Sequence, residues 1–253
     1  IHQCIAGLDI ALWDLAARRA GQPLWRMLGG HAPRVHVYAS GINPEYPERV
    51  AVACGAQGHI AFKLKVGFGE QQDLRNLHAL RDSLGADCTL MADANQGWDW
   101  QTALTMARKM AAFDLAWLEE PLRADRPWPE WQTLATSTAV PLAAGENLYG
   151  EAAFGEAIAA GALRVIQPDV AKWGGISGCL AVARRVSVRR GLREWRWGVL
   201  GERHGDRNDR PKFSGAAVFV QVIHRVLDGA DLFGVLVTDL DVELFFERHD
   251  QLD

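Results

Sequence analysis

The chain has 253 residues, 49% of them hydrophobic and 23% charged, and its formal net charge is −4 at pH 7. This length suits one α/β barrel or two small domains, and the composition is ordinary for a globular protein. A negative net charge does not favour nucleic acid, and no apolar run is long enough to span a membrane, so neither partner is expected. Four scattered cysteines indicate reduced, mostly buried thiols in a cytoplasmic protein.

Helical and extended patterns alternate as far as about residue 188. In the first predicted helix, apolar residues recur at the spacing of one helical face, at Ile5, Leu8, Leu12 and Leu15. The predicted helices span residues 3–20, 25–28, 47–58, 70–84, 100–113, 128–135, 151–160 and 177–186, and Asp99 is a good N-cap for the fifth. The predicted strands span residues 35–40, 61–67, 89–92, 115–118, 141–145 and 163–168. Beyond residue 188 the rhythm is lost, and residues 217–226 and 232–246 are candidate strands or helices.

The second predicted strand carries two lysines. Because side chains alternate along a strand, Lys63 and Lys65 point to one face, and the apolar residues Phe62, Leu64 and Val66 point to the other. A lysine inside a protein is costly unless it meets anions. The strand therefore predicts that acidic groups lie close to it.

Acidic residues follow the next four predicted strands, at Asp93, Glu119, Glu146 and Asp169. The intervals between them each correspond to about one strand, one helix and two loops, which predicts successive βα units. In a (β/α)8 barrel, polar residues at the C-terminal ends of the strands converge on one mouth. The sequence therefore predicts an α/β barrel whose pocket is lined by lysines and carboxylates.

Three of these carboxylates, on Asp93, Glu119 and Glu146, are the predicted ligands of a hard divalent cation. Mg²⁺ prefers oxygen ligands, and three converging carboxylates would repel one another without a cation between them. Each carboxylate taken alone could instead be a helix cap or an ion-pair partner. Their common rhythm favours the metal site.

Lys65 is the predicted general base, which requires that a neighbouring Lys63 and a cation favour its neutral form. The alternative is that both lysines only pair with the acidic cluster. Asp169 could orient a base or a ligand, or cap a helix. Asn95 could bind substrate or hold the metal loop, provided that the strand continues beyond Asp93. Lys172 could be a partner of the substrate or of a carboxylate, or a solvated loop lysine.

Five motifs together resemble the enolase superfamily, and more closely its mandelate racemase/muconate lactonizing enzyme group. They are KLK at 63–65, DAN at 93–95, WLEEP at 117–121, GEN at 145–147 and QPDVAKWGGISG at 167–178. The resemblance spans about residues 3–188 and implies a modified TIM barrel, a bound Mg²⁺ and removal of the proton α to a carboxylate. The negative charge that develops would be stabilised by the metal and a lysine ammonium.

Carried over to this chain, the resemblance implies Asp93, Glu119 and Glu146 as the metal ligands and Lys65 as the base, assisted by Lys63. It selects Glu119 rather than its neighbour in the WLEEP motif. The implied reaction is dehydration of a sugar acid, with racemisation or epimerisation of a 2-hydroxy acid as the alternative. A homo-oligomer is also implied.

The C-terminal part departs from the family pattern. The family's seventh-strand histidine, which pairs with the aspartate at position 169, is not recognisable, and His204 is the nearest candidate. We therefore interpret residues 1–30 as a remnant of the cap domain and linker helix, 31–188 as the barrel domain with the metal site, and 189–253 as an atypical segment. The barrel is then expected to be incomplete or distorted at its C-terminal strands. A catalytically inactive, truncated or frame-altered relative is the alternative.

Overall fold

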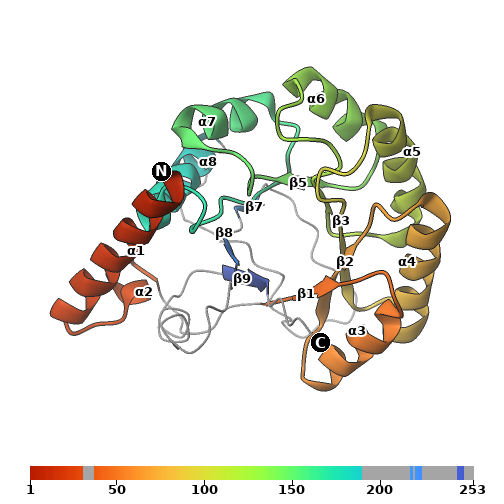
Figure 1. Cartoon of the computed structure of the whole chain (residues 1–253), viewed down its shortest axis with the longest axis horizontal. Coiled ribbons are helices and arrows are strands. Elements are labelled where there is room, and N and C mark those ends of the chain that lie inside the picture. The colour runs from red at the N-terminus through yellow and green to blue at the C-terminus, as the bar shows by residue number, and fades with distance from the viewer. Residues whose placement is uncertain (31–36, 190–216, 219, 224–243, 248–253) are drawn as a thin grey trace. The chain divides into compact units, whose positions relative to one another are not determined.

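The computed structural model describes residues 1–30, 37–189, 217–218, 220–223 and 244–247 (Figure 1). The chain forms two compact units. The first unit comprises Ile1–Val37, Gly145–Glu156 and Ile166–His249. The second unit comprises Tyr38–Ala144, Ala157–Val165 and Asp250–Asp253.

The second unit contains five strands that are neighbours in the order of the sequence. They are β1 (Ala39–Ile42), β2 (Ala61–Lys65), β3 (Thr89–Asp93), β4 (Leu118–Glu119) and β5 (Leu142–Ala144). Each neighbouring pair is parallel. Parallel strands need a crossover connection, which is usually a helix. This arrangement confirms the predicted α/β class.

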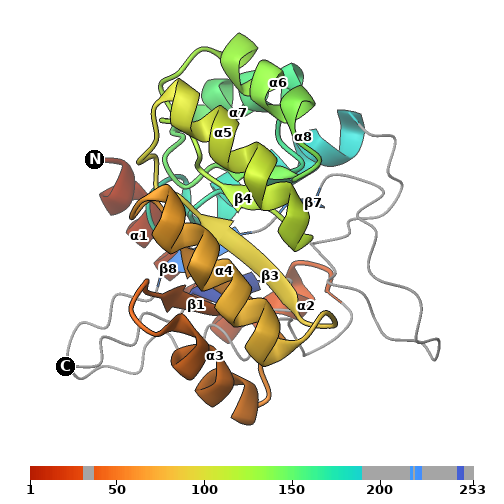
Figure 2. The same ribbon diagram turned by 90° about the vertical axis from the view of Figure 1, so that its right-hand side faces the viewer.

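Helices fill the connections between these strands, and Figure 2 shows α4 and α5 side by side over β3. The helices are α3 (Pro47–Ala56), α4 (Glu70–Leu84), α5 (Trp100–Met110) with the 3₁₀ turn η1 (Ala111–Phe113), and α6 (Trp128–Ser137). The side chain of Asp99 accepts a 2.8 Å hydrogen bond from the Thr102 N–H, which confirms the predicted N-cap of α5. This hydrogen bond lowers the pKa of the Asp99 carboxyl.

The chain crosses between the two units within α7 (Gly150–Ala160) and β6 (Val165–Ile166). The Arg164 N–H donates to the carbonyl oxygen of Leu142 at 2.9 Å, which ties the start of β6 to β5. The first unit also contains α1 (His2–Arg19), α2 (Leu24–Met27), α8 (Gly175–Arg189), β7 (Ala217–Val218), β8 (Val220–Ile223) and β9 (Leu244–Glu247). Strands β8 and β9 are paired in parallel.

The core of the first unit joins α1, α2 and α8. Its buried residues come from α1, α2, the loop after β6 and α8, and they are Ala17, Leu24, Trp25, Val170, Ile176 and Cys179. Polar contacts reinforce the same junction. The Asp9 carboxylate accepts a hydrogen bond from the Ser177 N–H at the start of α8, where the helix dipole favours a negative charge. The indole N–H of Trp13 donates to the Ser177 hydroxyl.

The apolar face predicted for α1 is exposed, although the helix itself is confirmed. Ile5, Leu8, Leu12 and Leu15 are 43% to 67% exposed, and the residues of α1 that are buried are alanines. The reason is that Asp9 and Trp13 lie on the face that contacts α8. The spacing of apolar residues identified a helix but not the side that packs.

Several predicted boundaries shift in the structure. Strand β1 spans residues 39–42 rather than 35–40, and residues 31–36 lie outside the described part. Helix α8 begins at Gly175, two residues before the prediction. All four cysteines are free as expected, but only Cys179 is buried, so the expected burial is wrong for the other three.

Most of the predictions for the C-terminal segment fall outside the described residues. Within the ranges 217–226 and 232–246, residues 217–218, 220–223 and 244–246 are described, and they are strands. His204 lies outside the described residues. So does most of the chain beyond residue 189, on which the predicted incompleteness of the barrel depends. Among the described residues, no helix combines the length and apolar character needed to cross a membrane.

Candidate functional site

The register of the parallel strands brings three charged residues of the second unit to one level. Lys65 at the end of β2 is opposite Asp93 on β3, and Asp93 is opposite Glu119 on β4. Lys63 lies two residues before Lys65 and therefore on the same face of β2. The sequence prediction that acidic residues meet this lysine strand is confirmed by this register.

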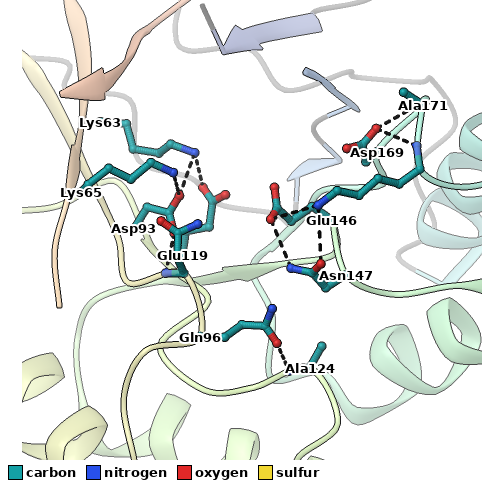
Figure 3. A network of polar contacts seen from close by, with 12 residues as sticks. Lys63, Lys65, Asp93, Gln96, Glu119, Ala124, Glu146, Asn147, Asp169 and Ala171 are labelled. Carbon is teal, nitrogen blue, oxygen red and sulfur yellow. Dashed lines mark hydrogen bonds and ion pairs between the residues drawn. The ribbon is translucent and has the colours of Figure 1, made fainter. Parts of the chain in front are cut away.

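Two ammonium groups contact two carboxylates at these strand ends (Figure 3). Lys65 Nζ lies 2.8 Å from Asp93 Oδ2. Lys63 Nζ lies 3.3 Å from the same oxygen and 2.9 Å from Glu119 Oε2. The Lys63 side chain is 0% exposed and that of Lys65 is 15% exposed. Lys65 is therefore the more accessible of the two lysines, and Lys63 is enclosed by the protein.

Two aromatic residues complete the surroundings of Lys63. Its Nζ lies 5.3 Å from the centre of the Tyr38 ring, a distance at which a ring face attracts a cation. The indole N–H of Trp117 donates to Glu119 Oε2 at 3.1 Å, and Tyr38 packs edge-on against Trp117. Neither aromatic residue was predicted to belong to the site. The WLEEP motif contains Trp117, but no local signal marks Tyr38.

A buried carboxylate on α4 holds the loop that follows Lys65. Asp73 accepts hydrogen bonds from the backbone N–H groups of Gly67, at 2.9 Å, and Phe68, at 3.2 Å. Burial raises the pKa of the Asp73 carboxyl, and the two hydrogen bonds oppose this rise. The Val66 N–H donates to the carbonyl oxygen of Asp93, so the loop is fixed on both sides of the lysine strand's end. Sequence reasoning missed Asp73 because it looks like an ordinary first-turn acid of a helix.

Asn95 does not share a strand face with Asp93. Strand β3 ends at Asp93, and Asn95 is exposed and adopts a left-handed backbone conformation with φ of 45°. The condition set for its predicted role is therefore not met. Its backbone N–H donates to Asp93 Oδ1 at 2.9 Å, which orients the Asp93 carboxylate. The next residue, Gln96, accepts a hydrogen bond from the Ala124 N–H through its side chain and ties this loop to the one after β4 (Figure 3).

The first unit carries the other predicted site residues. Lys172 Nζ lies 3.3 Å from Glu146 Oε1, and the Asn147 side-chain amide donates to the same oxygen at 3.1 Å. Asp169 Oδ1 accepts hydrogen bonds from the backbone N–H groups of Ala171, at 2.7 Å, and Lys172, at 3.0 Å (Figure 3). Lys172 therefore contacts both of the predicted acidic residues of this unit.

One oxygen of Asp169 is buried without a hydrogen bond. Oδ2 has no such partner among the described residues, and the whole residue is only 2% exposed. Burial raises the pKa of the Asp169 carboxyl, although the two backbone hydrogen bonds and the Lys172 charge lower it in part. A buried oxygen of this kind is suited to accept a hydrogen bond from a further group.

Two glycines of the WGGISG stretch allow close packing at the start of α8. Gly174 and Gly175 both have left-handed backbone conformations, with φ of 72° and 59°. A Cβ on Gly175 would lie 2.4 Å from Asp9 Oδ2, so the absence of a side chain allows Asp9 to cap α8.

The donor chemistry fits Mg²⁺ in part. The carboxylates of Asp93 and Glu119 contact one ammonium group and offer hard oxygen ligands. The described residues hold no group of three His, Cys, Asp or Glu side chains that could bind a metal ion. The predicted third ligand, Glu146, belongs to the first unit. Its participation stays a prediction.

Family models match most of the described chain. A model described as "Enolase C-terminal domain-like" matches residues 45–190, and one described as "Mandelate racemase / muconate lactonizing enzyme, N-terminal domain" matches residues 1–29. The chain belongs to the enolase superfamily. The resemblance stated from the five motifs is confirmed, including the mandelate racemase/muconate lactonizing enzyme group.

Two curated members of the superfamily illustrate its chemistry. The chain is 41% identical over 176 residues to a 3,6-anhydro-alpha-L-galactonate cycloisomerase of Streptomyces coelicolor, covering 68% of this chain and 48% of that protein. It is 40% identical over 186 residues to the L-talarate/galactarate dehydratase of Salmonella typhimurium, covering 71% of this chain and 46% of that protein. The chain thus spans about half the length of these relatives.

Two solved structures share the fold. A mandelate racemase/muconate lactonizing enzyme from Bordetella bronchiseptica is 46% identical with a TM-score of 0.80, and the match covers 97% of this chain and 62% of that one. An L-talarate dehydratase from Polaromonas sp. JS666, solved with Mg and L-glucarate, is 29% identical with a TM-score of 0.73, again over 97% and 62%. The predicted superfamily fold is therefore confirmed, and relatives bind magnesium.

Proposed function

We propose that this enolase-superfamily chain removes the proton α to the carboxylate of a sugar acid, as the first half of a dehydration. The observation that carries the proposal is the position of Lys65. Its ammonium nitrogen is 2.8 Å from Asp93 Oδ2, at the level of Glu119, and it is partly exposed where Lys63 is not. The relatives that are dehydratases of L-talarate and galactarate, one of them solved with L-glucarate, support a sugar acid as the substrate.

In the proposed reaction the neutral amine of Lys65 takes the α-proton, and the electron pair of the C–H bond moves into the substrate carboxylate. The β-hydroxyl then leaves, takes back the proton from Lys65 and departs as water. The enol that forms tautomerises to a 2-keto-3-deoxy acid. Magnesium, when bound, would stabilise the negative charge on the substrate carboxylate.

The other site residues have supporting roles in this proposal. Asp93, Glu119 and Glu146 supply the carboxylate ligands, and Lys63 orients Asp93 and Glu119 through the contacts seen in the second unit. Two further residues retain the roles proposed from the sequence: Asp169 orients a catalytic group through its buried oxygen, and Lys172 contacts the substrate. Asn95 is also proposed to contact the substrate, but from the loop after β3 rather than from the face of the strand. The same resemblance supports a homo-oligomer, which light scattering would test.

The test is exchange of the α-proton of galactarate or L-glucarate in D₂O with Mg²⁺, followed by NMR. The wild-type chain should exchange this proton, and Lys65→Ala should reduce the rate by about 100-fold or more, because a positioned base contributes that much. Lys109→Ala is the matched control, since Lys109 pairs with Glu70 on the exposed surface. Equal exchange by the Lys65 variant and the wild type would remove the base assignment. Exchange without loss of the hydroxyl would favour racemisation.

A further inference from the structure

The side-chain amide of Asn147 lies between a carboxylate and an ammonium group in the first unit. Its Nδ2 donates to Glu146 Oε1 at 3.1 Å, and Lys172 Nζ approaches its Oδ1 at 3.5 Å. Lys172 Nζ also lies 3.3 Å from Glu146 Oε1, so the three side chains form a closed triangle (Figure 3). Sequence reasoning named Glu146 and Lys172 but gave Asn147 no role.

The charges of its two neighbours fix the orientation of this amide. An ammonium group can only donate hydrogen bonds, and an ionised carboxylate can only accept them. The amide oxygen must therefore face Lys172, and the amide nitrogen must face Glu146. A flipped amide would place its nitrogen against the Lys172 ammonium, donor against donor. It would also place its oxygen against the Glu146 carboxylate, acceptor against acceptor. Lys172 is in turn held in place, because its backbone N–H donates to Asp169 Oδ1.

Both donors of the triangle use the same oxygen of Glu146. Asn147 and Lys172 bond to Oε1, and no described residue donates a hydrogen bond to Oε2. The Glu146 side chain is 12% exposed, so it is largely enclosed by the protein, unlike that of a surface glutamate. A carboxylate that is fixed through one oxygen presents its other oxygen in a defined direction. Groups that hydrogen-bond to metal ligands orient those ligands in this way.

We propose that Asn147 is a positioning residue, which together with Lys172 holds the Glu146 carboxylate by one oxygen and presents the other to a divalent cation. The inference rests on the proposed function, because it assumes that Glu146 is a metal ligand. Asn147 itself touches neither metal nor substrate in this proposal. Its effect is exerted through the orientation of Glu146.

The first measurement is a calorimetric Mg²⁺ titration of Asn147→Leu, which keeps the approximate size and removes the donor without changing the charge. Loss of an outer partner of a metal ligand typically weakens metal affinity by about 10-fold to 100-fold, and we expect about 10-fold here. Lys172→Arg, which keeps the charge and the ability to donate, should retain affinity within about threefold of the wild type.

Asn76→Leu is the matched control. The Asn76 amide donates to the carbonyl oxygen of Pro44 at 2.9 Å, which ties α4 to the loop after β1 in the second unit. This variant should lower the unfolding temperature, because it also removes a partly buried amide hydrogen bond, but it should not change the Mg²⁺ affinity. A fall in affinity for both asparagine variants would show a general loss of structure and overturn the proposal.

The second measurement needs no metal. The side-chain NH₂ signal of Asn147, identified by its disappearance in Asn147→Leu, should shift in both Glu146→Gln and Lys172→Met. If the signal moves in neither variant, the triangle does not exist and the proposal is overturned. If it moves but Asn147→Leu binds Mg²⁺ as tightly as the wild type, the positioning role is overturned. If the wild type binds no Mg²⁺, the proposed function fails, and the presentation of Glu146 to a cation fails with it, whatever the signal shows.

Discussion

The acidic groups of the two units are neutralised in different ways. In the second unit, Asp93 and Glu119 end adjacent strands and contact the ammonium groups of Lys63 and Lys65, which come from the neighbouring strand β2. In the first unit, the groups follow the strands rather than end them. Asp169 is held by two backbone N–H groups of its own loop, and Glu146 by side chains from two loops.

This difference implies that the charged groups of the second unit mainly affect the stability of the protein, and that those of the first unit mainly affect the orientation of carboxylates. Strand register fixes the charge pairs of the second unit, and their burial makes each partner costly to remove. The loops of the first unit fix direction through hydrogen bonds that are partly open to solvent, so a lost partner there changes geometry more than stability. Substitutions in the two units should therefore differ in the size and in the kind of their effects.

The largest expected effect is that of Lys63→Met in the second unit. This change removes the ammonium group that contacts the buried carboxylates of both Glu119 and Asp93. Breaking a buried charge pair by removing one partner typically costs about 3–5 kcal/mol of the free energy of unfolding. Urea denaturation at pH 7 measures this loss.

Lys109→Met serves as the comparison for Lys63→Met. Lys109 and Glu70 form a pair whose side chains are 44% and 48% exposed, and such pairs contribute about 1 kcal/mol or less. Similar losses of unfolding free energy for the two variants would mean that Lys63 is hydrated in solution. The contrast between the two units would then disappear.

A smaller effect is expected in the pH dependence of Asp169→Asn in the first unit. Burial raises the pKa of Asp169 in the folded protein above the ordinary value of 3.8. The carboxyl therefore contributes stability that is fully present below the unfolded pKa and is lost as the pH rises through the raised, folded pKa. The free energy of unfolding of the wild type, minus that of the variant, should fall with rising pH in this window.

Asp99→Asn should give the opposite slope. A hydrogen bond from Thr102 lowers the pKa of Asp99, so its contribution is present above pH 3.8 and is lost as the pH falls through the lowered pKa. Urea unfolding of the two variants and the wild type between about pH 3 and pH 7 gives both slopes. Slopes of the same sign would contradict the assignment of burial as the dominant influence on Asp169.

The sequence predicted those features that depend on short-range pattern. Helix α4 was predicted at residues 70–84 and found there, because its apolar periodicity ends at Gly85, whose φ of 80° suits glycine. The lysine strand was also predicted, because alternation alone assigns the faces of Lys63 and Lys65. The regular spacing of the βα units predicted that the acidic residues lie at the ends of successive strands.

Features that depend on distant partners could not be predicted in this way. Tyr38 approaches Lys63, and Asp73 binds the loop after Lys65, but nothing in their local sequence marks them. Asn147 lies in a motif quoted from the sequence, yet its role depends on Lys172, which comes from another loop. The third strand was predicted to end at residue 92 and ends at Asp93, but the left-handed backbone conformation of Asn95 was not predicted.

The smallest expected effect on the free energy of unfolding comes from helix α1. This helix also shows most clearly that the spacing of apolar residues does not identify the side that packs. Leu12 belongs to its regular apolar face but is 65% exposed, so Leu12→Ser should change the free energy of unfolding by less than about 0.5 kcal/mol. Leu24, 4% exposed in the core of the same unit, should cost about 2–5 kcal/mol as Leu24→Ala. Urea denaturation compares the two. A cost for Leu12→Ser that approaches the cost for Leu24→Ala would mean that the apolar face of α1 is covered in solution, and that the periodicity identified a packing surface after all.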